Sequence, residues 1–292
     1  MARAMTVAGR ATRDRRPIRW SHIATWTIAI VALVLVVLPF IYMISASFTP
    51  ESLVTQWPLV PWPRALSLEN YTYLFNASDV YIGRWFINSL VVTVAITLLT
   101  LAISAITAYA FARLRFPGRD VLFYICLSTL MIPFQATLLP IYLLMRYLHL
   151  LNTYGAVILP PLASVFGTFL LRQFFLGFPK ELEEAATVDG CNKLSVLWRI
   201  ILPNSGSALV ALGVVTFLNN WNELFWPLIA LSDPQMYTLP IGLGQLNGEY
   251  FGTPGPGVGM AAGVVASVPI LVFFFIFQRR IVEGIAMTGI KG

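Results

Sequence analysis

Charged residues are scarce in this sequence. Asp, Glu, Lys and Arg make up 11% of the 292 residues, hydrophobic residues make up 58%, and the mean hydropathy is +0.76. A soluble globular domain carries about 25% charged residues, because its surface must be hydrated. The shortage of charge therefore excludes a soluble globule and predicts an integral membrane protein.

Cysteine, histidine and catalytic motifs are nearly absent as well. Cys126 falls in an apolar run and Cys191 in a polar segment, so no disulfide or metal site is expected. The histidines, His22 and His149, lie near the ends of apolar runs, where an interfacial role is expected. The sequence has no Gly-x-x-x-x-Gly-Lys-Ser/Thr loop for ATP phosphates and no His-Glu-x-x-His or Gly-x-Ser-x-Gly motif. The chain is therefore not expected to be an enzyme.

Six apolar stretches are long enough to cross a hydrocarbon core of ~30 Å as helices that rise ~1.5 Å per residue. An all-α fold with six transmembrane helices is therefore expected. The first run, at about 24 residues, exceeds the ~7–15 residues of a secretory signal core and is predicted to be a retained anchor. The spans are placed at 23–46, 86–112, 121–147, 155–177, 204–231 and 258–278, after a basic N-terminal segment at 1–22, and 23–292 is predicted to form one transmembrane domain.

The basic residues predict the orientation of these spans. Sixteen of the 19 Lys and Arg lie before the first span, between the second and third, from the end of the fourth span to the start of the fifth, or after the last. Because cytoplasmic loops carry the excess of Lys and Arg, both termini and the loop at 178–203 are predicted to be cytoplasmic. The net charge of +6 flanks spans and does not form a patch interleaved with exposed aromatics, so nucleic-acid binding is not expected.

A polar segment at 178–203 interrupts the apolar spans. Pro179 suits the first turn of a helix, and the three glutamates that follow favour the positive end of the helix dipole. Gly190 suits the left-handed position that ends a helix, and the apolar run from Leu194 begins a second helix that returns to the membrane at Pro203. The segment predicts an elbow of two helices on the membrane face. From these residues alone, an interfacial elbow without a partner is equally consistent.

The elbow contains a spaced set of residues: Glu184-Ala185-Ala186, Gly190, Ile200 and Leu202-Pro203. This set resembles the EAA loop of ABC importer permeases, the coupling helix that sits in a groove of the ATP-hydrolysing subunit. Two positions depart from the usual pattern, since Cys191 stands in place of Ala and Trp198 in place of Phe. The resemblance implies that the chain couples to an ATPase through Glu181, Glu184, Ala185, Ala186, Asp189, Gly190, Leu194 and Trp198.

Further matches cover nearly the whole chain: Asn88-Ser89-Leu90, Tyr109-Ala110-Phe111-Ala112-Arg113, Phe116-Pro117-Gly118-Arg119, Trp221-Asn222-Glu223 and Gln278-Arg279-Arg280. They are similar to the carbohydrate-uptake branch of that family, which includes the smaller membrane subunit of maltose permeases. The resemblance implies a type I ABC importer transmembrane domain that forms half of a heterodimeric pore for a sugar or sugar derivative. It implies ABC ATPase subunits, a second permease subunit, an extracytoplasmic solute-binding protein and membrane lipid as partners. ATP and Mg²⁺ would bind the ATPase, and this chain would hold no cofactor.

Residues 232–257 form a predicted outward-facing loop rich in Gly and Pro. A loop of about 25 residues is long for a connector, and loops of that length are usually functional or disordered. In maltose permeases the corresponding loop reaches into the sugar-binding protein. The resemblance therefore makes Gln245, Asn247 and Tyr250 candidate contacts with the binding protein. The alternative is a hinge with no partner.

A polar cluster falls in the outer half of the fifth predicted span. Polar groups are costly in lipid, so the cluster is expected to face a cavity, a partner helix or the substrate path. Amides and a carboxylate bind sugar hydroxyls, an indole offers a flat face to a pyranose ring, and Gln135 in the third span is another predicted path residue. The alternative is that the cluster ties its helix to neighbouring helices. Its residues are Asn219, Asn220, Trp221, Asn222 and Glu223.

An ion-coupled secondary transporter of a small polar solute is the alternative function. Such a transporter requires several intramembrane carboxylates, and Glu223 stands nearly alone in the predicted spans. An intramembrane enzyme would need a nucleophile and a base at matched depth, and the spans offer hydroxyls without a histidine. The scarcity of titratable groups argues against both classes, and the sequence does not specify the cargo.

Overall fold

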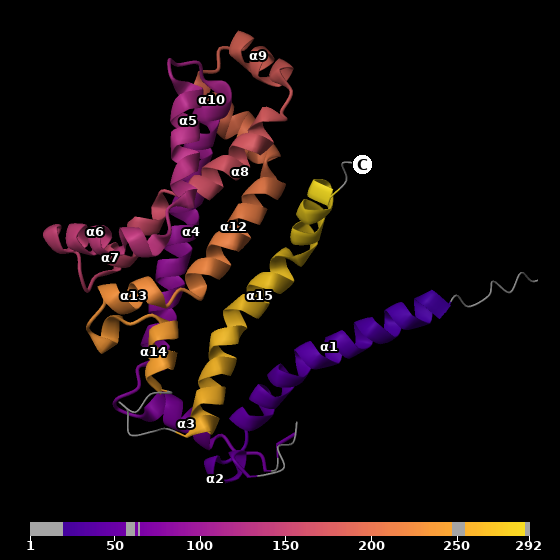
Figure 1. The fold of residues 1–292 in the computed structure, drawn as a ribbon, viewed down its shortest axis with the longest axis vertical. Coiled ribbons are helices and arrows are strands. Elements are labelled where there is room, and N and C mark those ends of the chain that lie inside the picture. Colours follow the sequence, from indigo (N-terminus) through magenta and orange to yellow (C-terminus); the bar gives the residue numbers. More distant parts are fainter. Residues whose placement is uncertain (1–19, 57–61, 64, 247–254, 290–292) are drawn as a thin grey trace, which may run out of the picture.

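The computed structural model describes residues 20–56, 62–63, 65–246 and 255–289, and every regular element in these ranges is a helix (Figure 1). The predicted all-α fold is confirmed for this part of the chain. The elements are α1 (Trp20–Ser47), α2 (Glu51–Val54), α3 (Glu69–Asn76), α4 (Ile82–Arg113), α5 (Arg119–Ser128), η1 (Thr129–Met131), α6 (Phe134–Tyr147), α7 (Tyr154–Ile158), η2 (Pro160–Leu162), α8 (Val165–Leu176), α9 (Lys180–Val188), α10 (Lys193–Val196), η3 (Leu197–Ile201), α11 (Leu202–Asn204), α12 (Gly206–Trp221), α13 (Phe225–Ala230), η4 (Pro234–Met236), α14 (Leu239–Leu246) and α15 (Pro256–Gly289).

Three helices within the described residues are long and apolar enough to cross a membrane by themselves: α1, α4 and α15. Three further pairs of helices pass the same test only when taken together, and each is bent. The bends are 101° between 119–131 and 134–147, 42° between 154–162 and 165–176, and 81° between 193–204 and 206–221. The described residues therefore hold three spans, or as many as six if each bent pair is one span.

The sharpest bend falls within the predicted span at 121–147, which is not a straight helix. Proline has no N–H to continue a helix, and it holds the residue before it in an extended conformation. Accordingly, Ile132 has φ −84° and ψ 115°, and Pro133 precedes the first turn of α6. In Figure 1, α6 runs crosswise to α4 and α5. Hydropathy thus predicted where this apolar segment lies, and Pro133 changes the direction of the chain within it.

The predicted span at 204–231 is also broken. α12 ends at Trp221, three non-helical residues follow, and α13 is a separate short helix. The polar cluster therefore lies at the end of a helix and not within a continuous span. The break is stabilised by Glu223, whose Oε1 accepts hydrogen bonds from the N–H groups of Phe225 (2.9 Å) and Trp226 (3.1 Å). These are N–H groups at the start of α13 that lack partners within the helix.

α4 is the central helix of the bundle. It packs along α8 and α12, while α15 packs against α12 and α1. Part of the buried face of α4 is built from small side chains, which lets neighbouring helices approach closely, as is common between helices in membranes. That face includes Ser89, Thr93, Thr97, Thr100, Ser104, Ala105 and Ala108. In contrast, the N-terminal part of α1 diverges from the other helices (Figure 1), and the most apolar window of α1 has no buried residue.

The predicted outward loop at 232–257 contains two helical segments, η4 and α14. Side chains of α4 hold the connection between them. Asn88 Nδ2 donates to the carbonyls of Gln235 and Tyr237, each at 2.9 Å, and Ser89 Oγ accepts the N–H of Leu239 at 2.7 Å. Within the sequence match at 88–90, Asn88 and Ser89 thus anchor η4, the connection that follows it and the first residue of α14. Of the predicted binding-protein contacts, Gln245 lies on α14, whereas Asn247 and Tyr250 lie outside the described residues.

The close packing of α14 on α4 depends on Gly242. A Cβ added at Gly242 would collide with the Trp85 ring, whereas a Cβ added at Gly244 would meet nothing within 4 Å. We expect Gly242→Ala to destabilise the protein by about 1–3 kcal/mol, the usual cost of overpacking a core. Gly244→Ala, on the same helix, should leave stability unchanged or slightly higher. Thermal denaturation of the two purified variants in detergent tests this, and equal melting temperatures would contradict it.

Candidate functional site

The elbow at 178–203 is a helix, a tight turn and a second helix, as predicted. α9 ends in two hydrogen bonds typical of a Schellman motif: Cys191 N–H to the Ala186 carbonyl at 2.9 Å and Gly190 N–H to the Thr187 carbonyl at 3.1 Å. Gly190 has φ +87°, a conformation that residues with a Cβ rarely adopt. The predicted left-handed Gly190 is confirmed. Asn192 Oδ1 then accepts the N–H of Ser195 at 2.8 Å and starts α10.

Arg113, the last residue of α4, joins the elbow to the bundle. Its Nε forms an ion pair with Glu183 Oε1 at 2.9 Å, and the side chains are only 6% and 12% exposed. Its Nη2 donates hydrogen bonds to the carbonyls of Phe175 (2.5 Å) and Phe178 (2.6 Å). These carbonyls lie at the C-terminal end of α8, where a cation is favoured by the helix dipole. Arg113 and Glu183 were not predicted as site residues, although both lie within or beside the matched motifs.

The inner face of the elbow is apolar and packs on its own chain. Ala186 is 7% exposed and belongs to a buried cluster with Val196, Leu197 and Ile201 of the elbow and Phe175 of α8. Since a helix turns ~100° per residue, the neighbouring Ala185 points elsewhere and is exposed. The resemblance implies coupling through both Ala185 and Ala186, but the two side chains lie on different faces of α9. Ala186 packs within its own chain.

The outer elbow face combines exposed acidic and apolar side chains. Three of the apolar ones, Val188, Leu194 and Trp198, are more than half exposed. Exposed apolar side chains grouped in this way are typical of protein interaction surfaces. The face comprises Glu181, Leu182, Glu184, Ala185, Val188, Asp189, Leu194 and Trp198, and it includes six of the eight predicted coupling residues. The remaining two are Gly190, which is exposed in the turn, and Ala186.

A groove of about 880 Å³ separates α9 from the residues that follow α4. It is lined mainly by charged side chains, among them Arg115, Lys180, Glu184 and Lys193. Beside it, Arg119 donates to both carboxylate oxygens of Asp120, at 2.9 and 3.2 Å. These hydrogen bonds lower the pKa of the Asp120 carboxyl below its ordinary value. The elbow thus lies next to a charged, hydrated surface.

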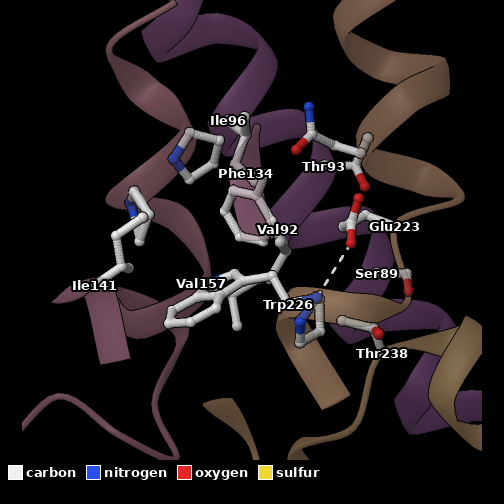
Figure 2. A pocket seen from close by; sticks show the side chains of 14 residues that line it. Ser89, Val92, Thr93, Ile96, Phe134, Ile141, Val157, Glu223, Trp226 and Thr238 are labelled. Carbon is white, nitrogen blue, oxygen red and sulfur yellow. Dashed lines mark hydrogen bonds between the residues drawn. The ribbon is translucent and has the colours of Figure 1, made fainter. Parts of the chain in front are cut away.

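A second candidate site is a partly open cavity of about 270 Å³ lined by α4, α6, the α7–η2 segment and the break between α12 and α13 (Figure 2). Its walls are mostly apolar, and Trp226 is fixed in one wall because its Nε1 donates to the Ala156 carbonyl at 2.9 Å. The polar lining residues are Ser89, Thr93, Asn220, Glu223 and Thr238, and the apolar ones are Val92, Ile96, Phe134, Ile141, Val157, Pro160, Pro161, Trp226 and Pro227.

The cavity contains two of the six predicted path residues, Asn220 and Glu223. Asn219 and Asn222 are exposed and do not line it, and neither does Gln135, which is exposed on α6 beside the lining residue Phe134. Sequence reasoning missed Ser89, Thr93 and Thr238, because isolated hydroxyls in an apolar run are common in packed helices.

The expectation that Trp221 offers a flat face to a sugar is wrong. Its side chain is 2% exposed, its ring stacks on Phe217 with 6.0 Å between centroids, and Phe86 meets it edge-on at 5.8 Å. Its Nε1 donates to the Ala266 carbonyl of α15 at 3.1 Å. Trp221 therefore ties α12 to α4 and α15, which is the alternative that the sequence left open.

Comparison with protein families gives a match over residues 101–286 to the family described as "Binding-protein-dependent transport system inner membrane component". The match covers the elbow and most of the bundle. The chain belongs to this family. It is accordingly a multi-pass inner-membrane transport component, which agrees with its apolar helices.

Relatives within the family are similar over most of their length. The chain is 39% identical over 258 residues to the arabinooligosaccharides transport system permease protein of Halalkalibacterium halodurans, covering 88% of this chain and 91% of the relative. It is 35% identical over 256 residues to the sulfoquinovosyl glycerol transport system permease protein of Agrobacterium fabrum, covering 87% and 88%.

A solved structure has the same fold. It is the crystal structure of a bacterial ABC transporter involved in the import of the acidic polysaccharide alginate. One chain of that structure matches with a TM-score of 0.82 at 24% identity, covering 90% of this chain and 97% of that one. This chain therefore has the fold of an ABC importer permease.

The ion pair between Arg113 and Glu183 should be needed to hold the elbow in place. Glu183→Gln would leave the Arg113 guanidinium buried without its counter-charge, a change that typically costs about 3–5 kcal/mol. Glu184→Gln, one position along on the exposed face, is the matched control and should cost almost nothing. Limited proteolysis within 178–203 and thermal denaturation in detergent measure both effects. The assignment fails if the two variants behave alike.

Proposed function

We propose that this chain forms half of the translocation path of a binding-protein-dependent ABC importer for a sugar or sugar derivative. ATP hydrolysis would take place on separate subunits, which would bind ATP and Mg²⁺. The observation that carries the proposal is the outer elbow face, an exposed apolar and acidic surface on a tightly anchored loop, in a chain of this family. The transport of oligosaccharides and sugar derivatives by its relatives supports the cargo class.

The proposed topology has six spans with both termini in the cytoplasm. The positions of Lys and Arg support the orientation, and the three bent helix pairs, counted as one span each, support the number. In this arrangement the elbow and Arg113 lie at the cytoplasmic ends of α4 and α8, and α14 lies at the outward end of α4. The elbow is then on the side of the membrane where ATP is available.

The elbow is suited to transmit motion to the spans. Its inner face shares a buried apolar cluster with α4, α8 and α12, and Arg113 links it by charge and hydrogen bonds to α4 and α8. When two ATPase subunits close on ATP, an elbow held by them would move these helices as a unit. Glu184 and Glu181, exposed on the outer elbow face, would pair with basic groups of the ATPase.

The remaining partners follow from the exposed surfaces. α1 presents apolar side chains along its length, which a second permease subunit and lipid would cover. At the outward end, α14 and the residues after it, including Gln245, Asn247 and Tyr250, would meet the solute-binding protein. The family description, binding-protein-dependent, supports such a partner. No observation favours the ion-coupled alternative, since Glu223 is engaged in capping α13.

The turn at Gly190 offers a sharp test of coupling. A Cβ at this position would meet nothing within 4 Å, but the backbone is left-handed at φ +87°, which Asn tolerates and a β-branched residue does not. Gly190→Val should therefore insert normally but lose most ATP-driven uptake while hydrolysis continues, and Gly190→Asn should retain uptake.

The measurement uses the complex reconstituted with its ATPase, second permease and binding protein, after a thermal-shift screen of glycans on the binding protein has identified the cargo. Uptake and ATP hydrolysis are recorded together. Normal uptake by Gly190→Val would contradict the proposed role of the elbow.

A further inference from the structure

The cavity holds buried hydroxyl groups that lack hydrogen-bond partners. Thr93 is 1% exposed and Thr238 is 4% exposed, and the Oγ1 atom of each has no partner among the described residues. Both side chains line the cavity, one from α4 and one from the segment before α14 (Figure 2). Buried polar groups are normally paired, so each hydroxyl is available to a ligand.

Thr93 differs from Thr97 and Thr107 of the same helix. Thr97 and Thr107 each donate to the carbonyl four residues earlier, at 2.7 and 2.8 Å, the usual way for a helical threonine to satisfy its hydroxyl. The hydroxyl of Thr93 makes no such bond and lies at the cavity wall. The wall therefore presents a polar group that the fold itself does not use.

The other lining groups suit one ring with hydroxyl substituents. Asn220 and Ser89 add an amide and a hydroxyl, and Glu223 adds a carboxylate. The rings of Phe134 and Trp226 and three prolines provide apolar surface, which packs against the C–H faces of a sugar. A volume of about 270 Å³ lies just under the ~300–1,000 Å³ typical of pockets for drug-sized ligands. The space is thus large enough for one ring.

The charge of the cavity selects against acids. Glu223 is the one charged residue that lines it within the described part of the chain, and no Lys or Arg does so. An acidic sugar would place a second negative charge in a mostly apolar space without a compensating cation, which is unfavourable. A neutral ring meets no such penalty and can donate its hydroxyls to Glu223.

We propose that this cavity, within a single permease chain, binds one ring of an uncharged sugar and discriminates against sugars with a carboxylate, sulfonate or phosphate group. The proposal rests on the proposed function and narrows its cargo class. Thr93, Thr238, Asn220 and Glu223 supply the hydrogen bonds, and Trp226 and Phe134 supply the apolar contacts.

The test uses the full chain in lipid nanodiscs and saturation-transfer NMR with matched glycosides. The probes are methyl galactoside against methyl galacturonate, methyl glucoside against methyl glucuronate, and methyl arabinoside. At least one neutral glycoside should bind, and its acidic counterpart should bind at least ~10-fold more weakly. Thr93→Val, which is nearly isosteric, should weaken binding of that neutral glycoside about five- to tenfold, the loss expected for one hydrogen bond.

Thr100→Val is the matched control. Thr100 is also 1% exposed and also lacks a partner for its Oγ1, but it does not line the cavity. Both valine variants should keep the melting temperature of the wild type, because neither hydroxyl makes a bond in the fold, and Thr100→Val should bind glycoside normally. Glu223→Gln keeps an oxygen to cap α13 and removes the charge, so it should narrow the difference between neutral and acidic glycosides.

Three results would overturn the proposal: equal or tighter binding of the acidic glycosides, equal binding by Thr93→Val and Thr100→Val, or no binding of any glycoside in the panel. These outcomes are separate from a failure of the proposed function, because they need neither ATP nor partner subunits. Normal uptake by Gly190→Val would remove the coupling role without changing glycoside binding.

Discussion

The arrangement of the bundle depends on the guanidinium of Arg113. One cation at the end of α4 pairs with the carboxylate of Glu183 on α9 and also donates hydrogen bonds to two carbonyls at the end of α8. Because the group is almost buried, its interactions are poorly screened, and losing any one of them leaves charge or dipole without a partner. The elbow is therefore part of the bundle, and its position is set by the same side chain that ends the central helix.

Broken helices are the second constraint on this fold. In lipid, every backbone group outside a helix must find a partner within the protein. At the breaks, side chains form hydrogen bonds with the backbone. Asn88 and Ser89 do so at the connection before α14, and Glu223 does so at the start of α13. The Oδ1 of Asn152 accepts hydrogen bonds from the N–H groups of Ser232 and Asp233. Several polar residues that attract attention in an apolar sequence thus support irregular backbone, and this need competes with any role in binding cargo.

Sequence reasoning predicted the features that depend on local chemistry. The long apolar helices α1, α4 and α15, the elbow and the left-handed Gly190 follow from hydropathy and from backbone rules at single residues. The direction of a helix does not, because hydropathy has the same value before and after Pro133. Trp221 and Ala186 were assigned to the wrong surroundings, since only packing decides which side of a helix is buried. The unused hydroxyl of Thr93 has no sequence signal at all, because it is defined by a missing bond.

The pairing of α1 with α15 has a consequence for how the protein is made. These two helices pack on one another, yet nearly all of the remaining chain separates them in sequence. During synthesis, α1 is made well before α15, so its apolar surface cannot contact α15 until residues 256–289 have been made. The contact between the two helices therefore forms late, and a ribosome that stalls before residue 256 would leave α1 without its partner helix.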